Sequence, residues 1–191
     1  MTTDAELIRA AFRRHVCQTS PEPLGIVVAR AGGSKLWDTD GRAYLDLLAG
    51  IGVANVGHTH PEVVAAVTEQ AKAYLHCAVY GEMAQQPQAL LAQRLAEVAP
   101  GDLATVYFTN SGAEAIEGAM KTARKHTGRK RFIAFEGSFH GDTFGAMSVG
   151  GNPLYKDPFE PLLADVEHLP FGAAAPLARI DDRVAAVGSE P

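Results

Sequence analysis

Cysteine is scarce in this chain, and no long apolar stretch opens it. Cys17 and Cys77 are the only cysteines among 191 residues and stand far apart, which excludes a disulfide framework and a cysteine pair with metal-ligand spacing. The first 14 residues mix charged side chains into apolar ones, a pattern typical of neither a signal peptide nor a membrane span. We therefore expect a cytoplasmic protein with no metal site and no membrane partner.

An excess of basic charge is absent as well. The chain has 17 Lys and Arg against 22 Asp and Glu, and its formal net charge is −5. The one basic cluster, residues 121–131, falls at the expected end of a helix, where cations interact favourably with the helix dipole. We interpret this cluster as a solvated helix end and expect no nucleic-acid partner.

Apolar residues form 47% of the chain, which is enough for a sizeable core. Short apolar runs predict buried strands over 105–109, 131–135 and 183–187. Apolar residues at three-to-four spacing predict helices that begin at Pro61, begin near Gln85 and cover 112–127. Strands that alternate with helices imply parallel pairing and a sheet covered on both faces, so we predict the α/β class. The Pro-rich stretch 152–176 is expected to be mainly loop.

The beginning of the chain is predicted to be small and rich in strands. Residues 4–18 have the pattern of an amphipathic helix, residues 26–38 that of a hairpin, and a further strand is expected to end near Leu48. We accordingly expect an N-terminal segment over 1–57 and part of a larger domain over 58–191.

The turn after residue 109 carries the clearest chemical signal. Gly112 lets a backbone approach a ligand closely, and the first N–H groups of the helix that follows have no intrahelical acceptors, so they can hold a phosphate. Ser111 and Glu114 also form a capping box, which needs no ligand. This motif alone is compatible with a phosphate site or with an ordinary helix start.

Longer blocks supply the context for this turn. Residues 108–124 and the later Phe139-His140-Gly141 resemble the phosphate loop and the aromatic-His-Gly element of the class III aminotransferases, and residues 36–46 and 50–61 resemble the N-terminal signature of that family. The resemblance runs from about residue 25 to residue 191. It implies the N-terminal segment and the first part of the large, mostly parallel-sheet domain of a fold type I enzyme.

The resemblance also implies a cofactor, pyridoxal 5′-phosphate, and a homodimer. Members of the family transfer an amino group from an amine or ω-amino acid donor to a keto acid or aldehyde acceptor. The hydroxyl of Ser111 and the N–H groups of Gly112 and Ala113 would hold the cofactor phosphate, Phe139 would lie against its ring, and His140 would shape the pocket. Without the resemblance, Phe139 and His140 would read as a core phenylalanine beside a partly buried histidine.

Further positions bear on the polar network and the substrate. By resemblance, Glu190 would support the polar network of the cofactor and Ile51 would line the substrate entrance. Asp142 stands where many relatives that act on ω-amino acids have an arginine, and its charge would repel a substrate carboxylate. Residues 140–143 look more like the diaminopelargonate-forming branch, whereas residues 111–114 look more like the ω-amino-acid branch.

No catalytic residue is expected in this chain. The Schiff-base lysine and the acidic partner of the cofactor lie, in the family, beyond the part that the resemblance covers, and none of the six lysines here stands in such a motif. We expect an N-terminal portion that is inactive alone, binds the cofactor poorly, and has an open apolar edge on the strand near Arg183. A non-catalytic binding or dimerisation module, and an aminomutase of the same family, are the alternatives.

Overall fold

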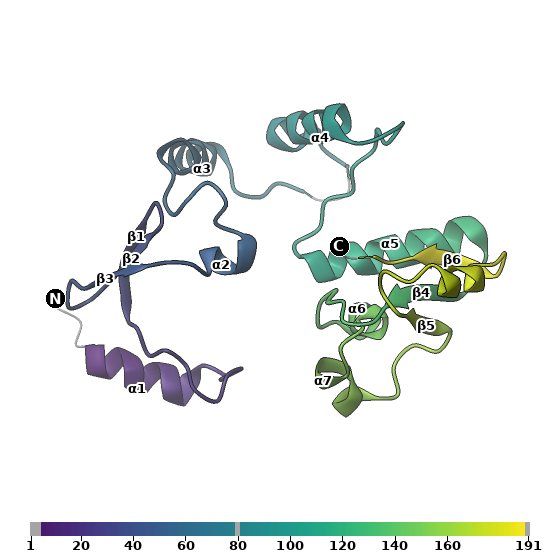
Figure 1. Ribbon diagram of the computed structural model, residues 1–191. Coiled ribbons are helices and arrows are strands. Elements are labelled where there is room, and N and C mark those ends of the chain that lie inside the picture. Colours follow the sequence, from purple (N-terminus) through teal and green to yellow (C-terminus); the bar gives the residue numbers. More distant parts are fainter. Residues whose placement is uncertain (1–4, 79–80, 190–191) are drawn as a thin grey trace. The chain divides into compact units, whose positions relative to one another are not determined.

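The computed structural model describes residues 5–78 and 81–189 (Figure 1). These residues form two compact units that divide between Ala84 and Gln85. This division separates two groups of residues that pack more among themselves than against each other. The sequence-derived boundary between residues 57 and 58 concerns the family fold and stays a prediction.

The first unit is built on a three-stranded antiparallel sheet in the order β1-β2-β3. Its strands are β1 (Val28–Gly32), β2 (Lys35–Asp38) and β3 (Ala43–Leu45). Its helices are α1 (Ala5–His15), α2 (Ala49–Gly52) and α3 (Pro61–Ala73). The predicted helix, hairpin and following strand are therefore confirmed, although the third strand stops before Leu48.

A buried aspartate organises the second turn of this sheet. One carboxylate oxygen of Asp38 accepts from the N–H groups of Asp40 and Arg42 at 3.0 and 2.8 Å, and the other accepts from the Tyr44 hydroxyl at 2.7 Å. The hydrogen bond from Tyr44 is the main cause of a lowered pKa at Asp38. This network fixes the β2–β3 connection.

The second unit contains a three-stranded parallel sheet in the order β5-β4-β6. Its strands are β4 (Arg131–Phe135), β5 (Val166–Leu169) and β6 (Val184–Val187). Its longer helices are α4 (Gln86–Val98) and α5 (Gly112–Thr127). Its shorter ones are α6 (Phe144–Val149), α7 (Pro153–Lys156), η1 (Asp157–Phe159) and η2 (Ala175–Arg179). The predicted mixed α/β class with a parallel sheet is confirmed.

The central strand β4 is buried on both faces. Phe132 and Ala134 belong to one apolar cluster, which they share with Met120 of α5 and Val149 of α6. The alternate residues of β4 form a second cluster with the neighbouring strands, made of Ile133, Phe135, Leu169 and Val184. An uninterrupted apolar run such as residues 131–135 is what a strand buried on both faces requires.

Two sequence-based assignments in this unit were wrong. Residues 105–109 form no strand, because the described residues provide no neighbour for a hydrogen-bonded ladder there, and Tyr107 is 67% exposed. Strand β5 lies inside the stretch that we expected to be mainly loop. Its sequence does not show the pattern of a strand, because only four residues pair with β4 and Glu167 and His168 interrupt the apolar run. The open edge expected near Arg183 is present in the described part, where β6 pairs with β4 alone.

Charged residues tie the strands together at the beginning of the sheet. Arg131, the first residue of β4, bonds to Glu167 on β5 and, at 3.3 Å, to the Asp181 carboxylate ahead of β6. Arg183 holds the same carboxylate at 2.5 Å, and this hydrogen bond is the main reason why the pKa of Asp181 falls from 3.8 to about 2.

The lowered pKa predicts an acid-dependent loss of stability. A carboxylate whose pKa is lower in the folded chain stabilises the fold above its unfolded pKa, and the stabilisation is lost as the pH falls from 3.8 towards about 2. Replacing Asp181 by Asn should flatten the dependence of the unfolding free energy on pH in this window, measured by denaturant titrations between pH 6 and pH 2. The adjacent Asp182→Asn variant is the control, and identical profiles for both variants would contradict the assignment.

Candidate functional site

The beginning of α5 is a capped helix start. Ser111 has extended backbone angles, and its hydroxyl accepts from the N–H of Glu114 at 3.1 Å. The Glu114 carboxylate reaches back and accepts from the N–H of Asn110 at 2.8 Å. Ser111 and Glu114 therefore cap the helix, as the capping interpretation of this motif predicted.

Capping leaves two backbone donors free. In the described part of the chain, the N–H groups of Gly112 and Ala113 have no hydrogen-bond acceptor. A Cβ added at Gly112 would meet nothing within 4 Å, so the space beside this residue is open. The helix start is thus both capped and able to bind an anion, because the cap uses only the N–H of Glu114.

The aromatic-His-Gly segment lies directly on this helix start. Gly141 has φ of +114°, and a Cβ placed on it would stand 2.5 Å from the Cβ of Ala113 and 2.9 Å from its Cα. Only a glycine allows this approach. The structure therefore brings together two of the elements that the sequence singled out, although they are separated along the chain by most of α5 and all of β4.

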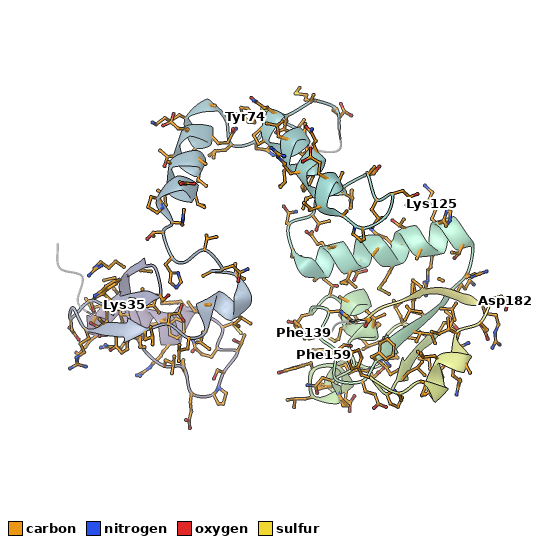
Figure 2. All side chains as sticks on the ribbon, turned by 45° about the horizontal axis from the view of Figure 1, so that its top comes forward. Lys35, Tyr74, Lys125, Phe139, Phe159 and Asp182 are labelled. Carbon is orange, nitrogen blue, oxygen red and sulfur yellow. The ribbon has the colours of Figure 1, made fainter. Side chains whose placement is uncertain are left out.

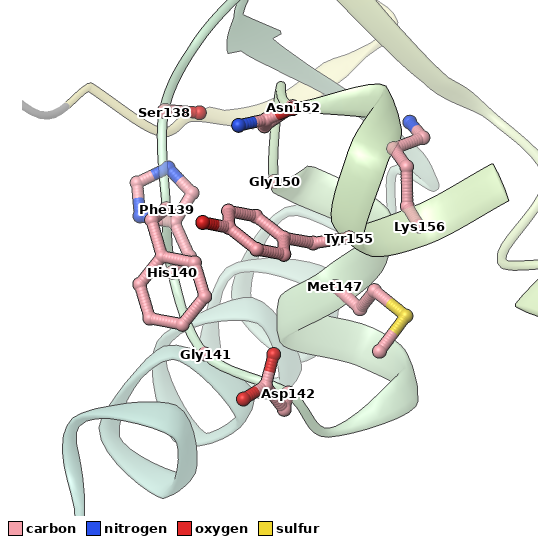
Figure 3. Close-up of a pocket in the computed structure, with 10 residues that line it drawn as sticks. All are labelled: Ser138, Phe139, His140, Gly141, Asp142, Met147, Gly150, Asn152, Tyr155 and Lys156. Atoms are coloured by element: carbon pink, nitrogen blue, oxygen red, sulfur yellow. The ribbon is translucent and has the colours of Figure 1, made fainter. Parts of the chain in front are cut away.

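Phe139 borders a pocket next to this contact (Figure 3). This residue is 49% exposed, and its ring meets the ring of Tyr155 edge to face, with 5.8 Å between centroids and 75° between planes. Apart from Phe139 and Tyr155, the pocket is lined by Ser138, His140, Gly141, Asp142, Met147, Gly150, Asn152 and Lys156. Asp142 is exposed at this pocket, and its predicted repulsion of a substrate carboxylate stays a prediction.

His140 presents a buried polar atom without a partner. Among the described residues, its Nε2 is buried and makes no hydrogen bond. A Cβ on Gly188, just past the end of β6, would lie 3.8 Å from this atom. The segment that carries His140 follows β4, so the site lies at the carboxyl ends of parallel strands, where open α/β sheets bind ligands. The predicted residue Glu190 lies outside the described residues.

Sequence analysis missed the contribution of α7 to the pocket. Tyr155 and Lys156 belong to this short helix, inside a stretch expected to be loop. The sequence did contain a signal for α7, because an Asn followed by a Pro is typical of a helix start. In the structure, the Asn152 side chain accepts from the N–H of Leu154 at 3.1 Å and so caps the helix. Nothing in the sequence indicated that this helix would face Phe139.

The lysines divide into one pocket residue and several surface residues. Lys156 lines the pocket. Lys121 and Lys125 are exposed on α5, as their spacing predicted, and Lys125 points away from the sheet (Figure 2).

Within the described ranges, no three His, Cys, Asp or Glu side chains are grouped so that they could hold a metal ion, and no helix is long and apolar enough to cross a membrane.

In the first unit, Ile51 is unusual in conformation. It has φ of +58°, a region that β-branched residues rarely adopt, and its side chain is 90% exposed. A hydrogen bond closes the segment around it: His58 Nε2 lies 2.6 Å from the Asp46 carboxylate, and this bond is the main cause of the lowered pKa of Asp46. The predicted role of Ile51 at a substrate entrance stays a prediction.

The contact between Gly141 and Ala113 gives a direct test. Gly141→Ala should lower the free energy of unfolding more than Gly137→Ala, because both glycines have positive φ but only Gly141 faces another residue. Positive φ costs an L-residue about 1–2 kcal/mol, and overpacking at Gly141 should add roughly 1–3 kcal/mol. Denaturant unfolding measures both, and equal losses would show that the contact with Ala113 contributes nothing.

Known proteins resemble this chain along most of its length. It is 50% identical over 162 residues to an acetylornithine aminotransferase of Methanopyrus kandleri, a match that covers 83% of this chain and 41% of that protein. It is 38% identical over 190 residues to the acetylornithine aminotransferase of Methanothermobacter thermautotrophicus, with 98% and 47% covered. The chain therefore spans less than half the length of these relatives.

Solved structures give the same picture. The adenosylmethionine-8-amino-7-oxononanoate aminotransferase of Methanocaldococcus jannaschii matches with a TM-score of 0.88 at 28% identity, over 96% of this chain and 46% of that one. The ornithine aminotransferase of Toxoplasma gondii, whose structure has pyridoxal phosphate at partial occupancy in its active site, matches with a TM-score of 0.82 at 28% identity, over 96% of this chain and 44% of that one. The predicted fold type I architecture is confirmed, and this chain corresponds to less than half of each of these structures.

A family model decides the assignment. The model described as Aminotransferase class-III matches residues 16–189, which is most of the chain. The matched range contains the α5 start, the Phe139-His140-Gly141 segment and the segment around Ile51. The chain belongs to the class III aminotransferase family.

Proposed function

We propose that this chain provides the phosphate-binding and ring-binding side of a pyridoxal 5′-phosphate site in an aminotransferase. The observation that carries the proposal is one juxtaposition: the free N–H groups of Gly112 and Ala113 lie beside the segment that bears Phe139 and His140. The whole protein would transfer an amino group from an amine or ω-amino acid to a keto acid or aldehyde. We extend the proposal to a homodimer in the cytoplasm, on the family resemblance.

The residues present suit the phosphate of this cofactor. A phosphate close to a dianion is stabilised by the positive end of the α5 dipole and by aligned backbone donors. The Ser111 hydroxyl accepts one hydrogen bond from Glu114, so its own hydrogen remains available to a phosphate oxygen. The open space beside Gly112 leaves room for the approach.

The chemistry of the residues that line the pocket suits the ring as well. The half-exposed Phe139 offers an aromatic surface, and the buried Nε2 of His140, which makes no hydrogen bond within the described residues, would offer a polar contact. When bound, the cofactor supplies an electron sink for the substrate carbon. The residues of this chain would hold its phosphate, fix the plane of its ring and exclude water, and we propose that Glu190 adds to the polar contacts.

We propose that two residues bias the choice of substrate. The Asp142 carboxylate at the pocket would repel a substrate carboxylate and attract an ammonium group. The exposed Ile51 would offer an apolar contact at the entrance. Donors with a positively charged or neutral end would therefore be favoured over donors that present a second carboxylate at this position.

We expect the chain alone not to turn over. The chemistry needs a lysine bound to the cofactor, and only Lys156 of the six lysines lines the pocket. Borohydride added to the chain with pyridoxal 5′-phosphate should fix the cofactor on no single lysine, as mapped by peptide mass. Specific labelling of Lys156 alone would contradict this expectation, and the chain would then have to be assayed with amine donors.

The phosphate assignment is tested by removing one donor. Gly112 is the first residue of α5, where proline fits the helix, and the extended Ser111 before it tolerates a proline neighbour. Gly112→Pro should weaken binding of pyridoxamine 5′-phosphate by at least about tenfold, because a hydrogen bond to a charged group contributes roughly 1.5–3 kcal/mol. This ligand has no aldehyde to react with lysines, and its fluorescence reports binding.

Gly112→Ala is the matched control, since it keeps the N–H and meets open space. Thermal unfolding of both variants checks that α5 is intact. We expect the chain alone to bind this ligand weakly. Equal affinities for Gly112→Pro and the unchanged chain would contradict the phosphate assignment, and so would a complete absence of binding by the unchanged chain.

A further inference from the structure

Glu117 of α5 makes an unusual set of contacts. One oxygen of its carboxylate accepts from the Thr143 hydroxyl at 2.6 Å, from the N–H of Gly145 at 3.0 Å and from the N–H of Ala146 at 3.3 Å. Thr143 is the N-cap of α6, so a carboxylate from one helix caps the start of another. The site described above does not use this residue.

Two glycines let the segment approach α5 at neighbouring turns. Ala113 and Glu117 are four residues apart and share a face of α5. Gly141 packs against Ala113, and a Cβ on Gly145 would collide with the Glu117 carboxylate. The segment from Gly141 to Gly145 therefore runs along this face and is fixed at both places.

The other end of the segment is fixed as well. The Ser138 hydroxyl donates to the carbonyl oxygen of Phe135 at 2.8 Å, and its own carbonyl accepts from the N–H of Gly151 at 2.9 Å. Phe139 and His140 thus stand between an anchor on β4 and an anchor on α5. Loss of the Glu117 hydrogen bonds would leave the contact of Gly141 with Ala113 as the remaining anchor on α5, and the segment would be held less precisely relative to the N–H groups of Gly112 and Ala113.

We infer that Glu117 is a positioning residue for the cofactor: its carboxylate sets Phe139 and His140 at the distance from the start of α5 that a ligand with both a phosphate and a ring requires. This inference rests on the proposed function. It adds a specific consequence, because loss of Glu117 should weaken ring recognition while the phosphate donors on α5 stay in place.

The test compares two probes on the full chain. Inorganic phosphate reports on the α5 donors alone, and pyridoxamine 5′-phosphate reports on the donors and the ring contacts. In Glu117→Ala the affinity for pyridoxamine 5′-phosphate should fall about tenfold, the lower end of what is lost when a residue that supports a metal ligand is removed, while the affinity for inorganic phosphate changes less than about twofold. Glu117→Gln keeps the accepting oxygen and should restore most of the loss.

A second variant guards against a simple folding defect. Gly145→Ala displaces the carboxylate without removing it and should show the same selective loss. The double variant Glu117→Ala, Gly145→Ala should be no worse than Glu117→Ala alone, because the two changes act on one contact. Glu62→Ala, an exposed acidic residue on α3, is the charge-matched control and should leave both affinities unchanged.

The outcomes separate this inference from the proposed function. A wild-type chain that does not bind pyridoxamine 5′-phosphate overturns both. Binding by the wild type with equal affinity in Glu117→Ala overturns the inference alone. Parallel losses for both probes, without rescue by Glu117→Gln, show that Glu117 only stabilises the fold and also overturn it.

Discussion

Burial of β4 on both faces is the constraint on which the second unit depends. Ile133 and Ala134, adjacent residues on opposite faces, are fully buried, so the strand has to have neighbours on both edges and cover on both sides. β5 and β6 supply the edges, and α5 and α6 pack on one face. Because β4 is fixed so completely, the backbone that leaves its carboxyl end is directed to one place, the start of α5.

Much of this arrangement could be predicted from local sequence. The strand at 131–135, the helix at 112–127 and its cap follow from periodicity and from Ser111 with Glu114, and the structure has all three. The family and its fold followed from the motifs over 108–124 and 139–141. These features depend on residues close together in the chain, so a local pattern can specify them.

The remaining features depend on residues far apart in the chain. Whether residues 105–109 form a strand is decided by the presence of a neighbour, and the apolar run cannot supply one. The contact of Gly141 with Ala113 and the acceptance of three hydrogen bonds by Glu117 join positions separated by more than 25 residues. The need for glycine at positions 141 and 145 becomes clear only once the residues that face them, Ala113 and Glu117, are known. A single sequence does not show which residues face each other.

The proposed site would bind its anion with little help from basic side chains, and this makes positioning important. The donors at Gly112 and Ala113 are uncharged amides, and the Glu114 carboxylate already interacts with the positive end of the α5 dipole. A free phosphate would therefore gain only modestly there. Discrimination in favour of the full cofactor has to come from the ring contacts, and Phe139 and His140 supply these only if the loop that carries them keeps its distance from α5. The Glu117 carboxylate caps α6 from α5 through three hydrogen bonds. In our proposal these bonds set the distance, so a charge that is structural in itself would determine which phosphorylated ligand the helix start selects.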